Sequence, residues 1–196
     1  MPIIEPIPLA ELAAEPRRII EDGVADGTYA TPVPLQIFAY RTPQLLLIHE
    51  KRMSRGGGSL LGGRILELIR IRSAQLGECQ PCMQSRKHDS ITDEDVACLL
   101  DAGHPDLTQQ ERMAIRFLDL LSADHHAIDA DFYRQLGEVF STAQIIELGL
   151  SCAETMGIHR FLHTLDIFGT EPPALPYSPG QVDARHAAGS TAAAVG

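Results

Sequence analysis

The sequence lacks an excess of positive charge. Its 16 lysines and arginines are outnumbered by 26 aspartates and glutamates, and the formal net charge is -10. Proteins that bind nucleic acids or anionic membrane surfaces usually present a basic face, so we expect neither kind of partner. The sequence also lacks an apolar run near the roughly 20 residues that span a bilayer. Its first residues lack the basic region and apolar core of a signal peptide, so we expect a cytoplasmic protein.

Segments with alternating apolar and polar residues, the pattern of a half-buried strand, are missing as well. Helix start signals are frequent instead. The clearest is the capping-box pattern from Thr108 to Glu111, and a similar cap at Ser141 precedes the longest apolar periodicity. An apolar fraction of 44% is sufficient for a packed core. We therefore predict an all-α fold.

The helices that we expect follow from these signals and from the positions of glycine and proline. The first runs over 9–20, with a break at Pro16 and glycines at 23 and 27 closing it, and residues 31–34 form a linker. Later helices are expected at 44–55, 60–76, 79–90, 92–102, from 108 onward, at 130–139 and at 141–165. We predict a single domain over 1–170, with its core at about 35–168, and a Pro-, Gly- and Ala-rich tail at 171–196.

Cysteine is scarce, but two of the four cysteines, Cys79 and Cys82, are separated by only two residues. Pro81 lies between them and suits the first turn of a helix, where its missing N–H would have no partner. A helix N-terminus lowers the pKa of a thiol and favours the reactive thiolate. In a reducing compartment such a pair is more typical of redox chemistry or metal binding than of a structural disulfide. We favour a redox pair, with two buried cysteines or half of a zinc site as the alternatives.

The other candidate metal ligands are weaker. Cys98 and Cys152 lie on apolar helix faces, which favours core packing. His159 and His163 are one helical turn apart, but no further ligand pattern accompanies them. We therefore name no metal ligand and no cofactor.

Glu67 lies in a nearly apolar stretch, which makes it a second residue of interest. If Gly77 marks a tight helical hairpin, Glu67 lies close to Arg86. Arg86 also follows Cys82 by one helical turn, so its charge would stabilise a Cys82 thiolate. The alternative is that Glu67 pairs with Arg64 or Arg70 of its own helix in a solvated stripe.

Taken in order, these features resemble the carboxymuconolactone decarboxylase and alkylhydroperoxidase D-like superfamily. The resemblance rests on Glu67, on Cys79-x-x-Cys82 twelve residues later, and on the Arg-bearing helix that follows. It covers roughly residues 35 to 168 and includes the segments 42–45, 58–61, 66–72, 107–112, 140–141 and 157–161.

The resemblance implies an all-α, alkylhydroperoxidase D-like helical bundle that assembles into dimers, trimers or hexamers. The peroxidase branch implies reduction of a small hydroperoxide, in which Cys82 attacks, Cys79 resolves and a thiol reductant completes the cycle. The spacing of the two cysteines alone does not choose the nucleophile. In that branch a histidine four residues after the second cysteine relays protons with the glutamate. Here Arg86 occupies that position, and arginine stays protonated, so the relay differs.

Two other functions are compatible with the sequence. One is a lyase or isomerase of the decarboxylase branch that acts on a small cyclic acid, with Arg64, Arg70 or Arg72 binding the carboxylate. The other is a non-enzymatic oligomeric module that binds a metal. Our leading prediction is the thiol-dependent peroxidase or disulfide oxidoreductase.

Overall fold

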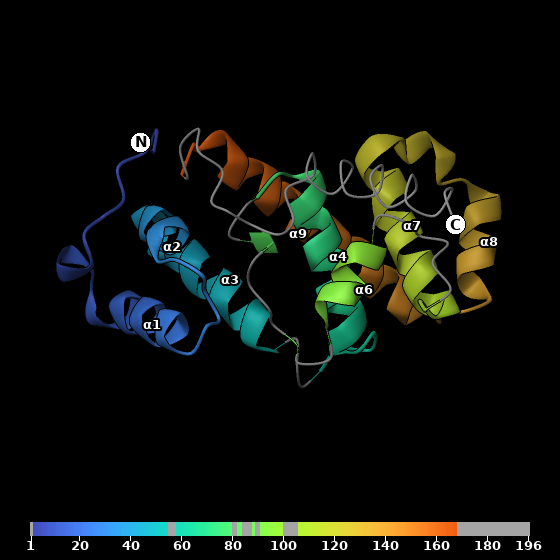
Figure 1. Ribbon diagram of the computed structural model, residues 1–196, viewed down its shortest axis with the longest axis horizontal. Helices are drawn as coiled ribbons and strands as arrows, with labels where there is room; N and C mark the ends of the chain where they lie inside the picture. The colour runs from blue at the N-terminus through green and yellow to red at the C-terminus, as the bar shows by residue number, and fades with distance from the viewer. Residues whose placement is uncertain are drawn as a thin grey trace, which may run out of the picture.

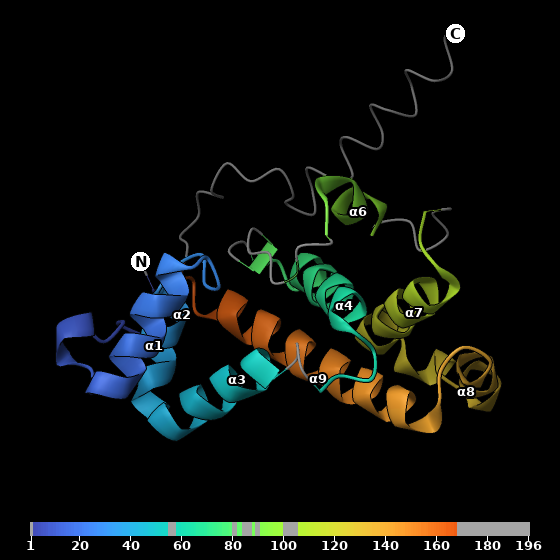
Figure 2. The ribbon, with the colours of Figure 1, turned by 90° about the horizontal axis from the view of Figure 1, so that it is seen from below.

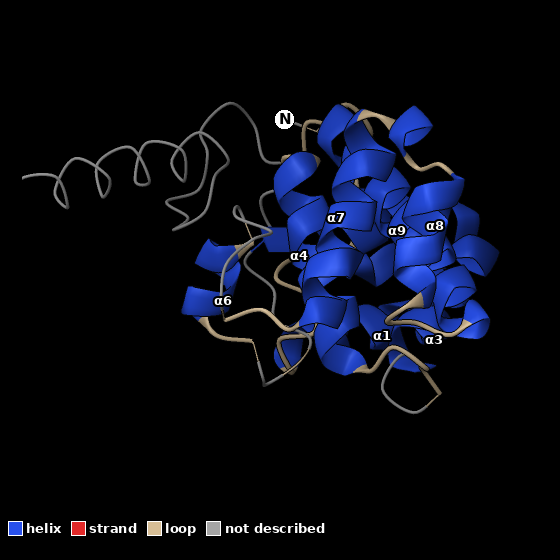
Figure 3. Ribbon diagram, turned by 90° about the vertical axis from the view of Figure 1, so that its right-hand side faces the viewer, coloured by secondary structure: helices blue, strands red, loops and turns tan. Residues whose placement is uncertain are grey.

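The computed structural model describes residues 2–54, 58–79, 82–83, 88, 91–99 and 106–167, and for residues 52–54 it describes the backbone only. These residues form helices and loops without any strand (Figure 3), which confirms the all-α prediction for this part of the chain. None of the helices described is long and apolar enough to cross a membrane. The predicted boundary near residue 170 and the tail at 171–196 lie outside the described residues.

The N-terminal part of the chain forms a cluster of short helices at one end of the molecule (Figure 1). They are η1 (Leu9–Glu11), α1 (Ala14–Ala25), α2 (Val33–Phe38), η2 (Ala39–Arg41) and α3 (Thr42–Ser54). Their shared core consists of apolar side chains from all of these segments except η1 and from the loops between them, namely Leu12, Ile19, Ile20, Tyr29, Leu35, Ala39 and Leu45.

Three predictions for this part of the chain are wrong. The first helix breaks before Ala14 rather than at Pro16, which lies in the first turn of α1, where a missing N–H costs nothing. Gly23 lies inside α1 and does not end the helix. The ring of Tyr29 packs on it, and a Cβ there would come within 2.3 Å of the ring, so the glycine provides space for Tyr29. The predicted linker at 31–34 already contains the start of α2, with Pro34 in its first turn.

The rest of the chain packs around α4 (Gly63–Leu76). This helix contacts α7 (Gln109–Ala123) and α9 (Thr142–Thr164), and α6 (Asp93–Cys98) covers a further side. Helix η3 (His125–Ala127) and helix α8 (Ala130–Gly137) follow α7, and α8 lies at the end of the molecule opposite α1 to α3 (Figures 1 and 2). Neighbours on several sides leave α4 buried over most of its length, including its polar residues Glu67, Arg70, Ser73 and Gln75.

The helix starts expected near residues 92, 108 and 141 are confirmed by α6, α7 and α9. Thr92, Thr108 and Ser141 each form a capping box with the residue three positions later. Helix α9 runs close to its predicted end, whereas α4 starts later than predicted, after Gly62 at a φ of 79°. Most of the helix predicted at 79–90 lies outside the described residues, although Cys82 and Met83 are helical.

Arg64 joins three of these helices. From α4 it donates through Nη2 to Asp95 Oδ1 at 2.5 Å and through Nε to Glu111 Oε1 at 2.6 Å. Both carboxylates also close the capping boxes of their own helices, α6 and α7. The hydrogen bond from Arg64 lowers the pKa of Asp95 from 3.8 to about 2, against the opposing effect of burial. For Glu111, burial raises the pKa, but hydrogen bonds from Thr108 and Arg64 outweigh it and lower the pKa overall.

Candidate redox site

Cys79 and Cys82 form a disulfide with an S–S distance of 2.01 Å and a Cα–Cα distance of 5.3 Å. The pair follows the end of α4 at Gly77 almost directly. Glu78 takes a positive φ of 52° and turns the chain, and the Cys79 N–H donates to the carbonyl of Ala74 in α4 at 3.0 Å. The end of α4 therefore fixes the position of the first cysteine.

The two cysteines differ in exposure. Cys79 is only 1% exposed, whereas Cys82 is half-buried. They belong to a cluster that joins the N-terminal helices to the ends of α4 and α9, with the apolar neighbours Ile37, Ala74, Met83, Leu162, Leu165 and Ile167. Because this apolar cluster encloses Cys79, an external reagent reaches Cys82 more easily.

Glu67 and Arg70 form a buried ion pair that contacts the main chain of Cys82. Arg70 donates from Nε to Oε2 and from Nη2 to Oε1 of Glu67, both at 2.7 Å. Its third nitrogen, Nη1, donates to the carbonyl oxygen of Cys82 at 2.6 Å. The two residues are 3% and 7% exposed, so they form a buried pair rather than the solvated stripe considered from the sequence. Arg86 lies outside the described residues, and its proposed contacts with Glu67 and Cys82 stay predictions.

The sequence did not predict the contact between Arg70 and Cys82. Arg70 was expected either to pair with Glu67 in a solvated stripe or to bind the carboxylate of a substrate. One signal for the contact is present in the sequence. Arg70 lies one helical turn after Glu67 in an otherwise apolar stretch, and a buried charge requires a partner.

The three arginines suggested for binding a carboxylate substrate each have a carboxylate partner within the chain. Arg64 contacts Asp95 and Glu111, Arg70 contacts Glu67, and Arg72 donates to Asp119 at 2.8 Å. Arg70 is also buried. This arrangement gives no support to the lyase alternative.

The sequence offered Cys98, Cys152, His159 and His163 as weaker candidate metal ligands. Cys98 and Cys152 are buried, as predicted, and burial together with the charge of Asp119 raises the pKa of Cys152 to about 12. Nδ1 of the buried His159 is hydrogen-bonded to Ser73 Oγ at 2.9 Å, whereas the side chain of His163 is more than half exposed. Within the described ranges, no group of three or more His, Cys, Asp and Glu side chains is arranged to hold a metal ion.

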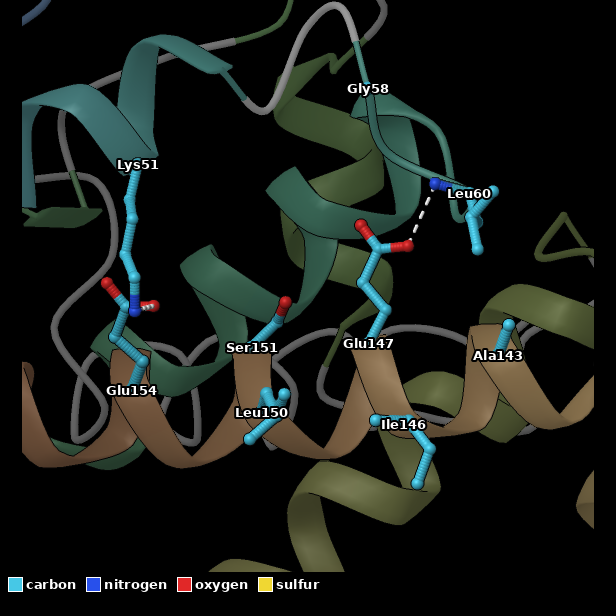
Figure 4. Close-up of a pocket in the computed structure, with 9 residues that line it drawn as sticks. All are labelled: Lys51, Gly58, Leu60, Ala143, Ile146, Glu147, Leu150, Ser151 and Glu154. Carbon is cyan, nitrogen blue, oxygen red and sulfur yellow. Dashed lines mark hydrogen bonds and ion pairs between the residues drawn. The ribbon is translucent and has the colours of Figure 1, made fainter.

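An open groove of about 390 Å³ lies between α3 and α9 (Figure 4). At one end Lys51 reaches across to Glu154, with Nζ and Oε2 3.6 Å apart. At the other end Glu147 accepts a hydrogen bond from the Leu60 N–H at 2.8 Å. The lining residues are Lys51, Gly58, Leu60, Ala143, Ile146, Glu147, Leu150, Ser151 and Glu154. The lining includes neither the redox pair of Cys79 and Cys82 nor the ion pair of Glu67 and Arg70.

Comparisons with protein-family models, with curated proteins and with solved structures find no match to this chain. The alkylhydroperoxidase D-like resemblance therefore stays a prediction, and the candidate function depends on the geometry around Cys79 and Cys82.

Proposed function

We propose that this protein is a thiol-dependent peroxidase, a disulfide oxidoreductase that reduces small hydroperoxides through Cys79 and Cys82. The observation that carries the proposal is the unequal burial of two cysteines that lie within disulfide distance. In this proposal the more exposed Cys82 meets the substrate, and the buried Cys79 lies beside it to resolve the product. In this proposal the all-α fold is an alkylhydroperoxidase D-like bundle, and the chain works as a homo-oligomer.

The reaction has three balanced steps. The Cys82 thiolate attacks the terminal oxygen of the hydroperoxide, so that an S–O bond forms, the O–O bond breaks, and the alcohol leaves after taking a proton from solvent. The Cys79 thiol then attacks the sulfenic acid on Cys82, which forms the disulfide and releases water. A dithiol reductant reopens the disulfide by exchange and is itself oxidised to a disulfide.

The burial supports Cys82 as the attacking residue and Cys79 as the resolving one, because a substrate oxygen must reach the nucleophile. Glu67 accepts hydrogen bonds from Arg70 with both carboxylate oxygens, which suits a positioning role better than a proton relay. We propose that Arg86 stabilises the Cys82 thiolate by its charge and that solvent supplies the proton to the leaving oxygen.

The experiment adds hydrogen peroxide or cumene hydroperoxide to the reduced protein and measures peroxide consumption with and without a dithiol reductant. We expect continued consumption with the reductant and, without it, a Cys79–Cys82 disulfide in quenched, alkylated samples. Cys82→Ser should abolish consumption. Without the reductant, Cys79→Ser should consume about one equivalent and leave a sulfenic acid that a dimedone-type reagent traps. Cys98→Ala is the matched control and should retain wild-type consumption. The proposal is refuted if peroxide, added without the reductant, leaves both thiols of the pair free.

A further inference from the structure

Both cysteines of the pair are attached to α4, by two different contacts. The Cys79 N–H donates to the Ala74 carbonyl, and the Cys82 carbonyl accepts from Arg70 Nη1 at 2.6 Å. Both hydrogen bonds use main-chain atoms of the cysteines, so reduction of the sulfurs removes neither the donor nor the acceptor. We infer that Arg70 is a positioning residue, which holds the main chain of Cys82 against α4 so that its thiol stays beside Cys79 after the disulfide opens.

The Glu67 carboxylate sets the direction of the Arg70 side chain. A guanidinium is planar, and two of its nitrogens are engaged by the two oxygens of Glu67 at equal distances of 2.7 Å. With that edge fixed, the remaining nitrogen points toward the Cys82 carbonyl. The burial of both side chains keeps water from competing for these hydrogen bonds.

A hydrogen bond and a disulfide that hold the same segment strengthen each other, because each one orders the chain that the other requires. Without the contact from Arg70, the main chain at Cys82 has more conformational freedom in the reduced protein. Disulfide formation must then remove that freedom. Losing this contact therefore weakens the disulfide relative to the two thiols. If the backbone of about one residue is freed, the equilibrium shifts about tenfold toward the dithiol. For a two-electron couple, this raises the reduction potential by about 30 mV.

This inference rests on the proposed use of Cys79 and Cys82 as a redox pair. The test equilibrates the intact protein with mixtures of reduced and oxidised glutathione and measures the fraction of disulfide by alkylation and mass spectrometry. Arg70→Lys keeps the positive charge but replaces the planar fork with a single ammonium, which cannot serve Glu67 and the Cys82 carbonyl in the same geometry. The matched control is Arg72→Lys, the same change on the same helix, at a residue that contacts Asp119.

If Arg70→Lys does not fold, the double variant Glu67→Leu/Arg70→Met provides the same test. It replaces the buried ion pair with apolar side chains of similar volume and leaves no buried charge unpaired. It also removes the donor to Cys82, so it should show the same shift.

We expect both Arg70 variants to shift the equilibrium about tenfold toward the dithiol, and Arg72→Lys to match the wild type. A folded Arg70 variant with the wild-type equilibrium overturns the inference, and so does an equal shift in Arg72→Lys, which would indicate general loosening of α4. A wild-type pair that does not equilibrate with glutathione overturns it too. The assay contains no peroxide. A chain that equilibrates but consumes no hydroperoxide refutes the peroxidase proposal and leaves the role of Arg70 intact.

Discussion

Replacing Arg64 with methionine tests the contact that joins α4, α6 and α7. The change removes charge-assisted hydrogen bonds to Asp95 and to Glu111, each worth about 1.5–3 kcal/mol. The Arg64 side chain is 31% exposed, so solvent screening reduces their sum. The lowering of the Asp95 pKa from 3.8 to about 2 corresponds by itself to about 2 kcal/mol. We therefore expect Arg64→Met to lose about 2–4 kcal/mol of unfolding free energy at neutral pH.

The pH dependence separates this electrostatic effect from lost packing. The pKa of Asp95 is lower in the folded state, so its contribution is fully present above its ordinary pKa of 3.8 and is lost as the pH falls toward about 2. The difference between wild type and Arg64→Met should therefore be constant from about pH 7 to 5 and shrink below about pH 4. Urea unfolding followed by circular dichroism at each pH measures it.

The matched control for this experiment is Arg134→Met, which breaks an exposed ion pair with Asp131 within α8. We expect it to leave the unfolding free energy unchanged, because solvent screens exposed pairs. The reasoning is refuted if Arg64→Met is no less stable than this control. A difference from wild type that stays equally large at neutral and acid pH also refutes it, since packing loss alone would then explain the effect.

Three further predictions follow from local environments. Gly157→Ala should stabilise the protein by about 0.5–1 kcal/mol in a thermal melt, because the position is inside α9 and a Cβ there meets nothing within 4 Å. Gly23→Ala should lower the melting temperature, since its Cβ would come within 2.3 Å of the Tyr29 ring; an unchanged melt would contradict this packing. Cys152, with its pKa raised to about 12 by burial and by Asp119, should resist alkylation in the reduced native protein and react after unfolding, as mass spectrometry can check.

The sequence by itself determined the features that depend on neighbouring residues. A capping box forms between side chains and backbone N–H groups three residues apart, so the starts of α7 and α9 were readable at Thr108 and Ser141. The close spacing of Cys79 and Cys82 likewise predicted a pair able to form a disulfide, and the apolar faces around Cys98 and Cys152 predicted their burial.

Only the tertiary structure decided the contacts between segments far apart in the chain. The role of Gly23 is one example, since this glycine makes room inside α1 for the Tyr29 ring and does not end the helix. The partner of Glu67 depended on how deeply α4 is covered. Because α6, α7 and α9 surround that helix, Glu67 and Arg70 are held out of water and must satisfy each other, and the spare nitrogen of Arg70 reaches Cys82, twelve residues later in the chain.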